Sequence, residues 1–283
     1  MKRRTFLKRM IGGIISIFGI GSGTYYYAKE VEPKLLDIHH VTIQSPKIPA
    51  SFDSYKILQF SDTHIGFHYS IDQLKELVLE INGLNPDLIA FTGDLVDHPQ
   101  QFNWNSEIVS TLASMNAADG KYWIYGNHDH GGYGTDIVKQ VFDEAGFQLL
   151  KNSHRLLNRN GDKIMLAGLD DIMLGQPDIS AAIQSAEDYD FTILLVHEPD
   201  FADTVKDYEV DVQISGHSHG GQVQLPFVGY IYTPYLAEKY VEGRYQVGSK
   251  PLQLYVSRGI GTTRLPYRFF CKPEITVYEL KKG

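Results

Sequence analysis

Short apolar segments that end in turns bearing Asp, Asn or His recur along this chain. Residues 55–60 run into Asp62 and His64, and residues 87–91 run into Asp94. Later segments repeat the arrangement with Asn127, His197, His217 and His219. Short apolar runs bounded by turn residues are typical of buried strands, and open α/β sheets bind ligands beyond the carboxyl ends of their strands. The pattern therefore predicts strands whose polar turns meet at one edge of a sheet.

Amphipathic stretches lie between these strands. Apolar residues at helical spacing predict helices over residues 70–83, 104–117 and about 133–145, the last ending at Gly146. Asn160-Gly161 lies between two apolar segments and predicts a β-hairpin.

Alternating segments dominate the chain from Gln222 onward. Residues 252–256 and 274–279 alternate apolar and polar side chains, which indicates a second, mostly antiparallel sheet. The sequence shows neither an internal repeat nor a linker that would mark a domain boundary. The expected fold is an α/β domain over residues 31–283, with two sheets packed face to face and helices outside.

The polar turns together form a set of metal-ligand residues. They supply Asp, Asn and His donors, which can hold two divalent cations side by side without a thiolate. Cys271 is the single cysteine, so the chain has neither an internal disulfide nor a cysteine zinc site. Asp and Asn are also common turn formers, but seven such residues in this arrangement favour a metal centre over turns alone. This residue chemistry indicates metal-assisted phosphoester hydrolysis.

The charge distribution argues against a polyanion-binding protein. Residues 31–283 hold 20 Lys and Arg against 33 Asp and Glu. A negative body does not attract nucleic acid by its overall field, so we expect no nucleic-acid binding.

The first 30 residues are expected to be a targeting segment. Arg3-Arg4-Thr5-Phe6-Leu7-Lys8 resembles the twin-arginine export signal, and the apolar run from Ile11 to Ile20 follows it. The resemblance implies an exported bacterial protein that uses the twin-arginine export machinery. Small residues at Gly21-Ser22-Gly23 would allow cleavage, whereas Tyr25-Tyr26-Tyr27 would suit the interface of a retained membrane anchor. Both outcomes, a membrane-anchored protein and one released to the cell wall or extracytoplasmic space, remain open.

The ordered blocks resemble the calcineurin-like metallophosphoesterases. The blocks are Asp62-Thr63-His64, Gly93-Asp94, Gly126-Asn127-His128-Asp129, His197 and Gly216-His217-Ser218-His219. The segments 216–222 and 256–275 further resemble the exported bacterial YkuE-type subgroup. The resemblance implies a four-layer sandwich of two mixed sheets flanked by helices.

The resemblance also implies a role for each residue. Asp62, His64 and His219 would hold one metal, Asn127, His197 and His217 would hold a second, and Asp94 would bridge them. The implied cofactors are two divalent ions, with Mn, Fe and Zn all compatible with these donors. A hydroxide between the metals would attack phosphorus. His128 would assist the leaving group, and Asp129 would orient the His128 imidazole.

Several alternatives remain open at this point. The substrate could be a small-molecule or envelope-polymer phosphoester, or the enzyme could be a pyrophosphatase on a nucleotide-linked lipid or sugar such as UDP-diacylglucosamine. A non-catalytic metal-binding scaffold belongs to a different class. Arg258 and Arg268 are candidates either for clamping phosphate or for structural ion pairs. His68 and His130 are candidates for substrate contact or for packing.

Overall fold

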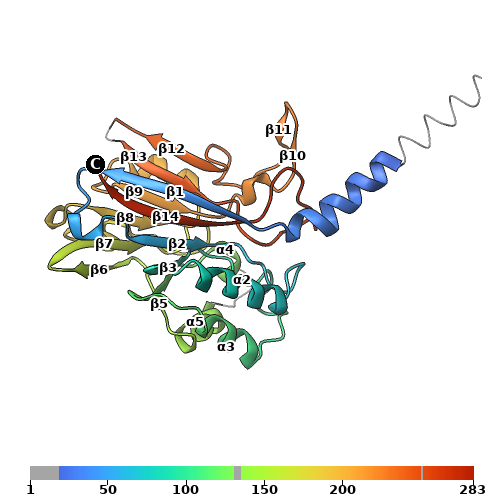
Figure 1. The fold of residues 1–283 in the computed structure, drawn as a ribbon, viewed down its shortest axis with the longest axis horizontal. Helices are drawn as coiled ribbons and strands as arrows, with labels where there is room; N and C mark the ends of the chain where they lie inside the picture. The colour runs from blue at the N-terminus through green and yellow to red at the C-terminus, as the bar shows by residue number, and fades with distance from the viewer. Residues whose placement is uncertain (1–18, 131–134, 250) are drawn as a thin grey trace, which may run out of the picture.

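The computed structural model describes residues 19–130, 135–249 and 251–283. Two β-sheets pack face to face, and helices cover the outer face of each (Figure 1). This is the expected four-layer α/β arrangement. The twin-arginine motif lies outside the described residues. Within the described ranges, no helix is both long and apolar enough to span a membrane.

The first sheet has the strand order β1-β14-β2-β3-β4-β5. Its strands are β1 (Asp37–Ser45), β14 (Glu274–Lys282), β2 (Lys56–Phe60), β3 (Leu88–Phe91), β4 (Lys121–Trp123) and β5 (Phe147–Leu149). Strands β2 to β5 pair in parallel, so their carboxyl ends share one edge. Strand β14 pairs antiparallel with β2 and parallel with β1.

The second sheet has the order β12-β13-β9-β8-β7-β6. Its strands are β12 (Gly243–Val247), β13 (Leu252–Val256), β9 (Val212–Ser215), β8 (Thr192–Leu195), β7 (Asp162–Gly168) and β6 (Ser153–Arg159). The four central strands pair in parallel, and only the two edge strands are antiparallel. A small hairpin, β10 (Gln224–Leu225) and β11 (Gly229–Tyr230), stands apart from both sheets.

The prediction of a mostly antiparallel second sheet was wrong. Residues 252–256 do form a strand of that sheet, but β14 joins the first sheet, where Thr276 lies opposite Gln59. Alternation along a strand reports which side chains face the core and carries no information about the neighbouring strand. Pairing is decided by contacts between segments that are far apart in sequence.

Three helices cover the first sheet, and the sequence predicts all three with small differences in length. They are α2 (Ile71–Gly83), α3 (Ser106–Ala113) and α5 (Thr135–Glu144). Ser70 and Gln73 form a capping box at the start of α2, and the Asn105 side chain caps α3. These caps satisfy backbone N–H groups that have no partner inside the helix.

The buried side chains form three layers of core. One layer joins helices α2, α3 and α5 to the first sheet, and a second fills the space between the sheets. The third lies under the short helices α6 (Ile179–Ala182) and α7 (Ala202–Val205) on the outer face of the second sheet. The predicted hairpin is confirmed between β6 and β7, where Asn160 and Gly161 both have positive φ angles, as this tight turn requires.

The N-terminal helix leaves the body beside the β10–β11 hairpin (Figure 1). Residues 19–26 are helical, and a short π-helix, Tyr27–Val31, follows. The Ala28 carbonyl accepts a hydrogen bond from Arg268 N at 2.9 Å, and the Tyr27 ring lies edge-on to Phe269. The end of this helix is therefore packed against the loop that follows β13.

Candidate metal centre

The predicted ligand residues all follow the carboxyl ends of parallel strands. Asp62 and His64 follow β2, and Asp94 follows β3. Asn127 begins the short helix α4 (Asn127–His130), which comes after β4. His197 follows β8, and both His217 and His219 follow β9 of the second sheet. The site is therefore assembled across the ends of both sheets.

Unusual backbone conformations aim several of these side chains. Five of the seven predicted ligands have positive φ angles: Asp62 55°, His64 43°, Asp94 65°, His217 66° and His219 52°. This region is unfavourable for residues with a side chain, at roughly 1 kcal/mol or more each. Such strain is characteristic of functional sites, where surrounding structure holds the residues in place.

Two glycines make room for the carboxylates. A Cβ atom on Gly126 would lie 2.3 Å from Asp94 Oδ1, and one on Gly216 would lie 2.5 Å from Asp62 Oδ2. Both distances are below any normal contact. The glycines in the Gly-Asn-His-Asp and Gly-His-Ser-His blocks thus permit the close approach that the site requires.

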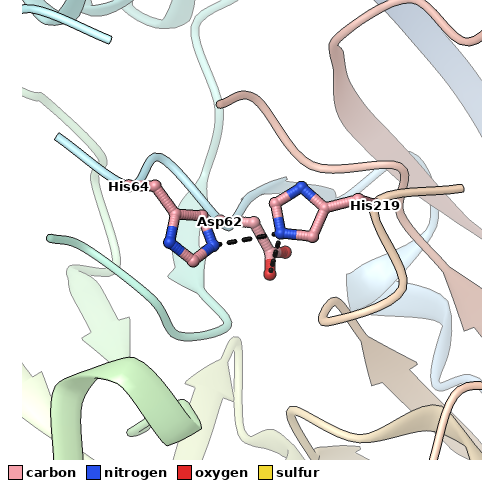
Figure 2. Close-up of side chains that lie close together, drawn as sticks. All are labelled: Asp62, His64 and His219. Carbon is pink, nitrogen blue, oxygen red and sulfur yellow. Dashed lines mark hydrogen bonds and ion pairs between the residues drawn. The ribbon is translucent and has the colours of Figure 1, made fainter. Parts of the chain in front are cut away.

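The first group of candidate ligands consists of Asp62, His64 and His219. Their side chains point toward one another, as Figure 2 shows, and their ligand atoms lie within 4.8 Å of one another. His219 Nε2 is 3.0 Å from His64 Nε2 and 3.6 Å from Asp62 Oδ1. All three residues are buried, so nitrogen and oxygen lone pairs converge in a space with little water.

The second group consists of Asp94, His197 and His217, whose ligand atoms also lie within 4.8 Å. Asn127 Oδ1 is a buried acceptor without a hydrogen-bond partner in the described structure. A buried acceptor is normally satisfied, so an unpartnered oxygen among histidines and carboxylates fits a cation ligand. The donor set is thus compatible with divalent metal ions.

Asp94 links the two groups. Its Oδ2 atom lies 3.5 Å from His64 Nε2 and 3.2 Å from His197 Nε2. Its Oδ1 atom accepts a hydrogen bond from the backbone N–H of His128 at 2.8 Å. A single carboxylate therefore faces candidate ligands from both sheets.

Backbone carbonyls hold two of the imidazoles. His197 Nδ1 donates to Thr92 O at 2.6 Å, and His217 Nε2 donates to Tyr235 O at 2.8 Å. In the neutral ring, each bond leaves the other nitrogen as the acceptor that can bind a metal. The tautomers expected of metal-binding histidines are thus fixed by the fold.

Two ionisable groups of the site have pKa values below their usual range. Burial opposes ionisation of Asp94, but His197 and His128 hold the pKa of its carboxyl well below the usual range. Burial, reinforced by His197, lowers the pKa of His217 to about 3. Asp94 is therefore ionised and His217 neutral near neutral pH, which are the forms that bind cations.

A family model for calcineurin-like phosphoesterases matches residues 55–221, more than half of the chain and a span that includes all seven candidate ligands. The chain belongs to the calcineurin-like phosphoesterase family. Membership makes it a metal-dependent phosphoester hydrolase.

Relatives of this phosphoesterase cover nearly its whole length. The uncharacterized metallophosphoesterase YkuE of Bacillus subtilis is 47% identical, over 99% of this chain and 98% of that protein. The phosphodiesterase YaeI of Escherichia coli is 27% identical over 99% of each chain. The UDP-2,3-diacylglucosamine pyrophosphatase LpxG of Chlamydia muridarum is 27% identical, over 94% of this chain and 97% of that protein.

A solved structure shows the same fold. The dimetal phosphatase from Danio rerio superposes with a TM-score of 0.50 at 11% identity, covering 77% of this chain and 94% of that one. The similarity confirms the expected architecture of two mixed sheets flanked by helices.

His128 of the phosphoesterase lies beside the first group. Its ring is perpendicular to that of His64, with centroids 4.5 Å apart, and it lines the cavity above the metal-ligand residues. Nδ1 donates to the Asp97 carbonyl at 2.8 Å, so Nε2 is the nitrogen available to a substrate. Burial lowers the pKa of His128, but Asp94 and the Asp97 carbonyl outweigh it and raise the pKa above its usual value. The protonated form suits an acid.

Asp129 occupies a different position from the one expected. Its carboxylate accepts hydrogen bonds from the backbone N–H groups of Asp94 at 2.8 Å, Leu95 at 3.0 Å and Gly126 at 2.9 Å. These bonds fasten the loop after β3 to the loop after β4. Asp129 thus positions the Asp94 and Asn127 loops, whereas the His128 ring is oriented by Asp97. Position next to His128 in sequence was a misleading guide because α4 turns successive side chains in different directions.

Asp97 is the residue that sequence reasoning missed. Its Oδ1 atom lies 3.1 Å from His64 Nδ1, and the Thr263 hydroxyl donates to the same atom at 3.4 Å. Asp97 thus holds both His64 and His128, one through its carboxylate and one through its carbonyl. The only sequence signal was a carboxylate three residues after Asp94, which is too common to single out.

The remaining candidates take structural positions. Arg258 pairs with Glu274 and Asp37, and Arg268 is buried with its guanidinium donating to backbone carbonyls. His130 Nε2 lies 2.8 Å from Asp170 Oδ1, and His68 lines a separate cavity beside the N-terminal helix. Neither arginine faces the candidate metal centre with a free guanidinium.

Proposed function

We propose that this phosphoesterase hydrolyses its substrate at a pair of divalent cations. Asp62, His64 and His219 would hold one ion, and Asn127, His197 and His217 the other. The observation that carries the proposal is Asp94, whose Oδ2 atom faces a ligand histidine of each group at 3.5 and 3.2 Å. Carboxylates are suited to a position between two cations because they offset the mutual repulsion of the ions. Mn, Fe and Zn are all compatible with these donors.

The residues around the centre would have separate roles in hydrolysis. Divalent cations, when bound, polarise the phosphoryl group and lower the pKa of water. Asp94 fixes the His128 backbone through the 2.8 Å hydrogen bond to its N–H, and the Asp97 carbonyl fixes the ring. His128 can then deliver the proton from Nε2 to the leaving oxygen, a role typically worth ~10²–10⁴-fold in rate. Asp129 keeps the two loops in register.

We further propose that the enzyme works in the cell envelope. Support comes from Arg3-Arg4-Thr5-Phe6-Leu7-Lys8 and the apolar run after it. Export through the twin-arginine machinery would leave the protein outside the cytoplasmic membrane, either anchored or released. Replacing both arginines (Arg3→Lys with Arg4→Lys) should retain the protein in the cytoplasmic fraction of a bacterial host. Unchanged fractionation would overturn the proposal.

A pyrophosphatase on a nucleotide-linked lipid or sugar is the second candidate. It is favoured by similarity along nearly the whole chain to LpxG, whose name states that it cleaves UDP-2,3-diacylglucosamine. The same metal centre can serve either a phosphate ester or a pyrophosphate, so the distinction depends on what surrounds it.

An activity screen of the Mn²⁺-loaded protein tests these proposals. Phosphomonoesters, phosphodiesters and nucleotide-linked pyrophosphates should be compared, with Asp94→Asn as the inactive control. We expect turnover in one class that requires metal and is lost in the variant. Inactivity toward all classes, together with a stable partner complex, would favour a non-catalytic scaffold.

A further inference from the structure

The cavity that contains the metal-ligand residues is lined by two chemically different sets of residues. Its volume is about 480 Å³. The first set, which we call the floor, comprises His64, Asp94, Asn127, His128, His217 and His219. The second set, which we call the wall, comprises the large apolar and aromatic lining residues Met173, Val223, Ile231, Tyr232, Tyr235 and Leu265. A phosphoryl group needs only the floor, so the wall requires a separate explanation.

Four of the wall residues are at least half exposed, which is a large fraction for apolar side chains. Ile231 is 60% exposed, Tyr232 50%, Tyr235 65% and Leu265 55%. Single exposed apolar residues are common, but a contiguous group beside a binding site is characteristic of a surface that a ligand covers. The wall thus presents apolar area directly next to the candidate metal centre.

The wall is a built structure with defined hydrogen bonds. Gln222 and Thr263 exchange two of them, at 2.9 and 2.8 Å, which join the segment leading to β10 with the loop bearing Leu265. The Ile231 N–H donates to the Val223 carbonyl at 3.1 Å. These bonds join the segments that carry Val223, Ile231 and Leu265.

Two hydrogen bonds connect the segments that carry the wall to the candidate metal centre. The Tyr235 carbonyl accepts the hydrogen bond from His217 Nε2 at 2.8 Å. The Thr263 hydroxyl donates to Asp97 Oδ1, the atom that also contacts His64. A group on the wall and a phosphorus atom over the floor would therefore sit in a fixed relation to each other.

Further apolar residues and one arginine belong to the same segments of chain as the wall residues. The β10–β11 hairpin stands at the end of the molecule from which the N-terminal helix leaves (Figure 1), and its residues include the exposed Leu225, Phe227 and Val228. Arg264 lines the same cavity, with its guanidinium carbon 5.0 Å from the Tyr232 ring centroid. An exposed arginine beside apolar residues suits an anionic amphiphile.

We propose that the substrate is a phosphoester or pyrophosphate that carries a hydrocarbon chain, and that the chain lies along the wall formed by Ile231, Tyr232, Tyr235 and Leu265. The inference rests on the proposed hydrolytic function and adds its substrate class. Hydrolysis forms a bond from water oxygen to phosphorus and breaks the bond to the leaving oxygen. The hydrocarbon chain contributes binding energy without taking part in the chemistry.

Alkyl 4-nitrophenyl phosphate diesters test this proposal on the full-length, Mn²⁺-loaded protein. The ethyl and octyl esters have the same leaving group and differ only in chain length. We expect kcat/KM for the octyl ester to exceed that for the ethyl ester by about tenfold or more, because each buried methylene contributes favourable transfer energy. Calorimetric titration should likewise show tighter binding of octylphosphonate than of ethylphosphonate, independently of turnover.

Two variants at exposed wall positions make the test specific. Ile231→Ser and Leu265→Ser should bring the octyl-to-ethyl ratio toward one. Leu79→Ser is the matched control, since Leu79 is an exposed leucine on α2 and does not line the cavity. Its ratio should equal that of the wild type.

The outcomes separate the two proposals. Turnover of both esters with equal kcat/KM, and equal binding of both phosphonates, would overturn the hydrocarbon site and leave the hydrolytic function standing. If neither these esters nor any ester or pyrophosphate in the activity screen shows metal-dependent turnover, both proposals are overturned.

Discussion

The Nε2 atoms of His64 and His219 lie 3.0 Å apart, although 155 positions separate the two residues in sequence (Figure 2). One imidazole belongs to the loop after β2 of the first sheet and the other to the loop after β9 of the second. Asp62 Oδ1 lies 3.6 Å from the same His219 nitrogen. Two sheets thus bring three lone-pair donors to one point, which is the geometry of a cation site.

Asp94→Asn should lose metal and activity together. The amide keeps the shape of the side chain but removes the negative charge that faces both His64 and His197. We expect the fall in kcat to exceed about 100-fold, since loss of a mere supporting residue already costs 10–100-fold. Elemental analysis and steady-state kinetics on the same preparation would check this. Full metal content with wild-type turnover would contradict the bridging role.

His128→Ala should separate metal binding from rate. His128 lines the cavity and is held by the Asp97 carbonyl, outside the two groups of candidate ligands. We expect metal content near wild type and a rate loss of ~10²–10⁴-fold for substrates with a poor leaving group. Esters of 4-nitrophenol should be less affected, because their leaving group departs as a phenolate and needs no proton. An equal loss for both leaving groups would argue against proton donation.

Asp97→Asn should weaken metal binding at the candidate centre, because the variant no longer holds His64 in place. The carboxylate accepts from His64 Nδ1 and so keeps Nε2 available as a ligand. We expect metal affinity or activity to fall by ~10–100-fold. Asp53→Asn is the control, because Asp53 is an exposed aspartate that pairs with Lys281. Competition with a chelator would measure the affinity, and identical values for Asp97→Asn and the control would exclude the positioning role.

Arg268→Met should destabilise the fold. The buried guanidinium donates to the carbonyls of Gly259, Gly261 and Cys271, which would be left without these partners. Each unsatisfied buried group costs ~1–3 kcal/mol, so we expect a loss of about 3 kcal/mol or more and a fall in Tm of roughly 6–12 °C. Arg264→Met, at an exposed arginine, should change stability by no more than about 0.5 kcal/mol. Calorimetry would compare them, and an unchanged Tm for Arg268→Met would show that water replaces the guanidinium.

Asp170→Asn should change how the free energy of unfolding depends on pH under acidic conditions. Burial opposes ionisation of Asp170, but hydrogen bonds from His130 and the Gln176 backbone lower its pKa to about 2. The folded-state pKa is below the unfolded value of ~3.9, so the ionised form contributes stability above that pH, and the contribution is lost as pH falls toward 2. We expect the wild type to exceed the variant by on the order of 2 kcal/mol near pH 6 and by little near pH 2. Urea unfolding at several pH values would measure the difference, and one that is independent of pH would refute the ionic origin.

The exposed aspartate Asp72 supplies the comparison for that experiment. It pairs with Lys75 at the surface, where ion pairs contribute little. Asp72→Asn should therefore leave the stability profile close to that of the wild type between pH 2 and 6.

The sequence by itself determined the strands, the helices and the chemical character of the site. Apolar runs ending in polar turns predicted the strands whose carboxyl ends carry Asp62, Asp94 and His197, because burial imposes its periodicity on the local sequence. The residue types alone indicated nitrogen and oxygen ligands for divalent metal ions, without cysteine.

Only the tertiary structure decided which residues meet. In the folded protein, β14 pairs within the first sheet. The His128 ring is oriented by Asp97 and not by Asp129. Apolar side chains line the same cavity as the metal-ligand residues. These relations join segments that are far apart in the chain, or depend on the direction in which one helical turn points a side chain. Local periodicity carries no record of either, because both arise when two independently patterned sheets pack their ends together.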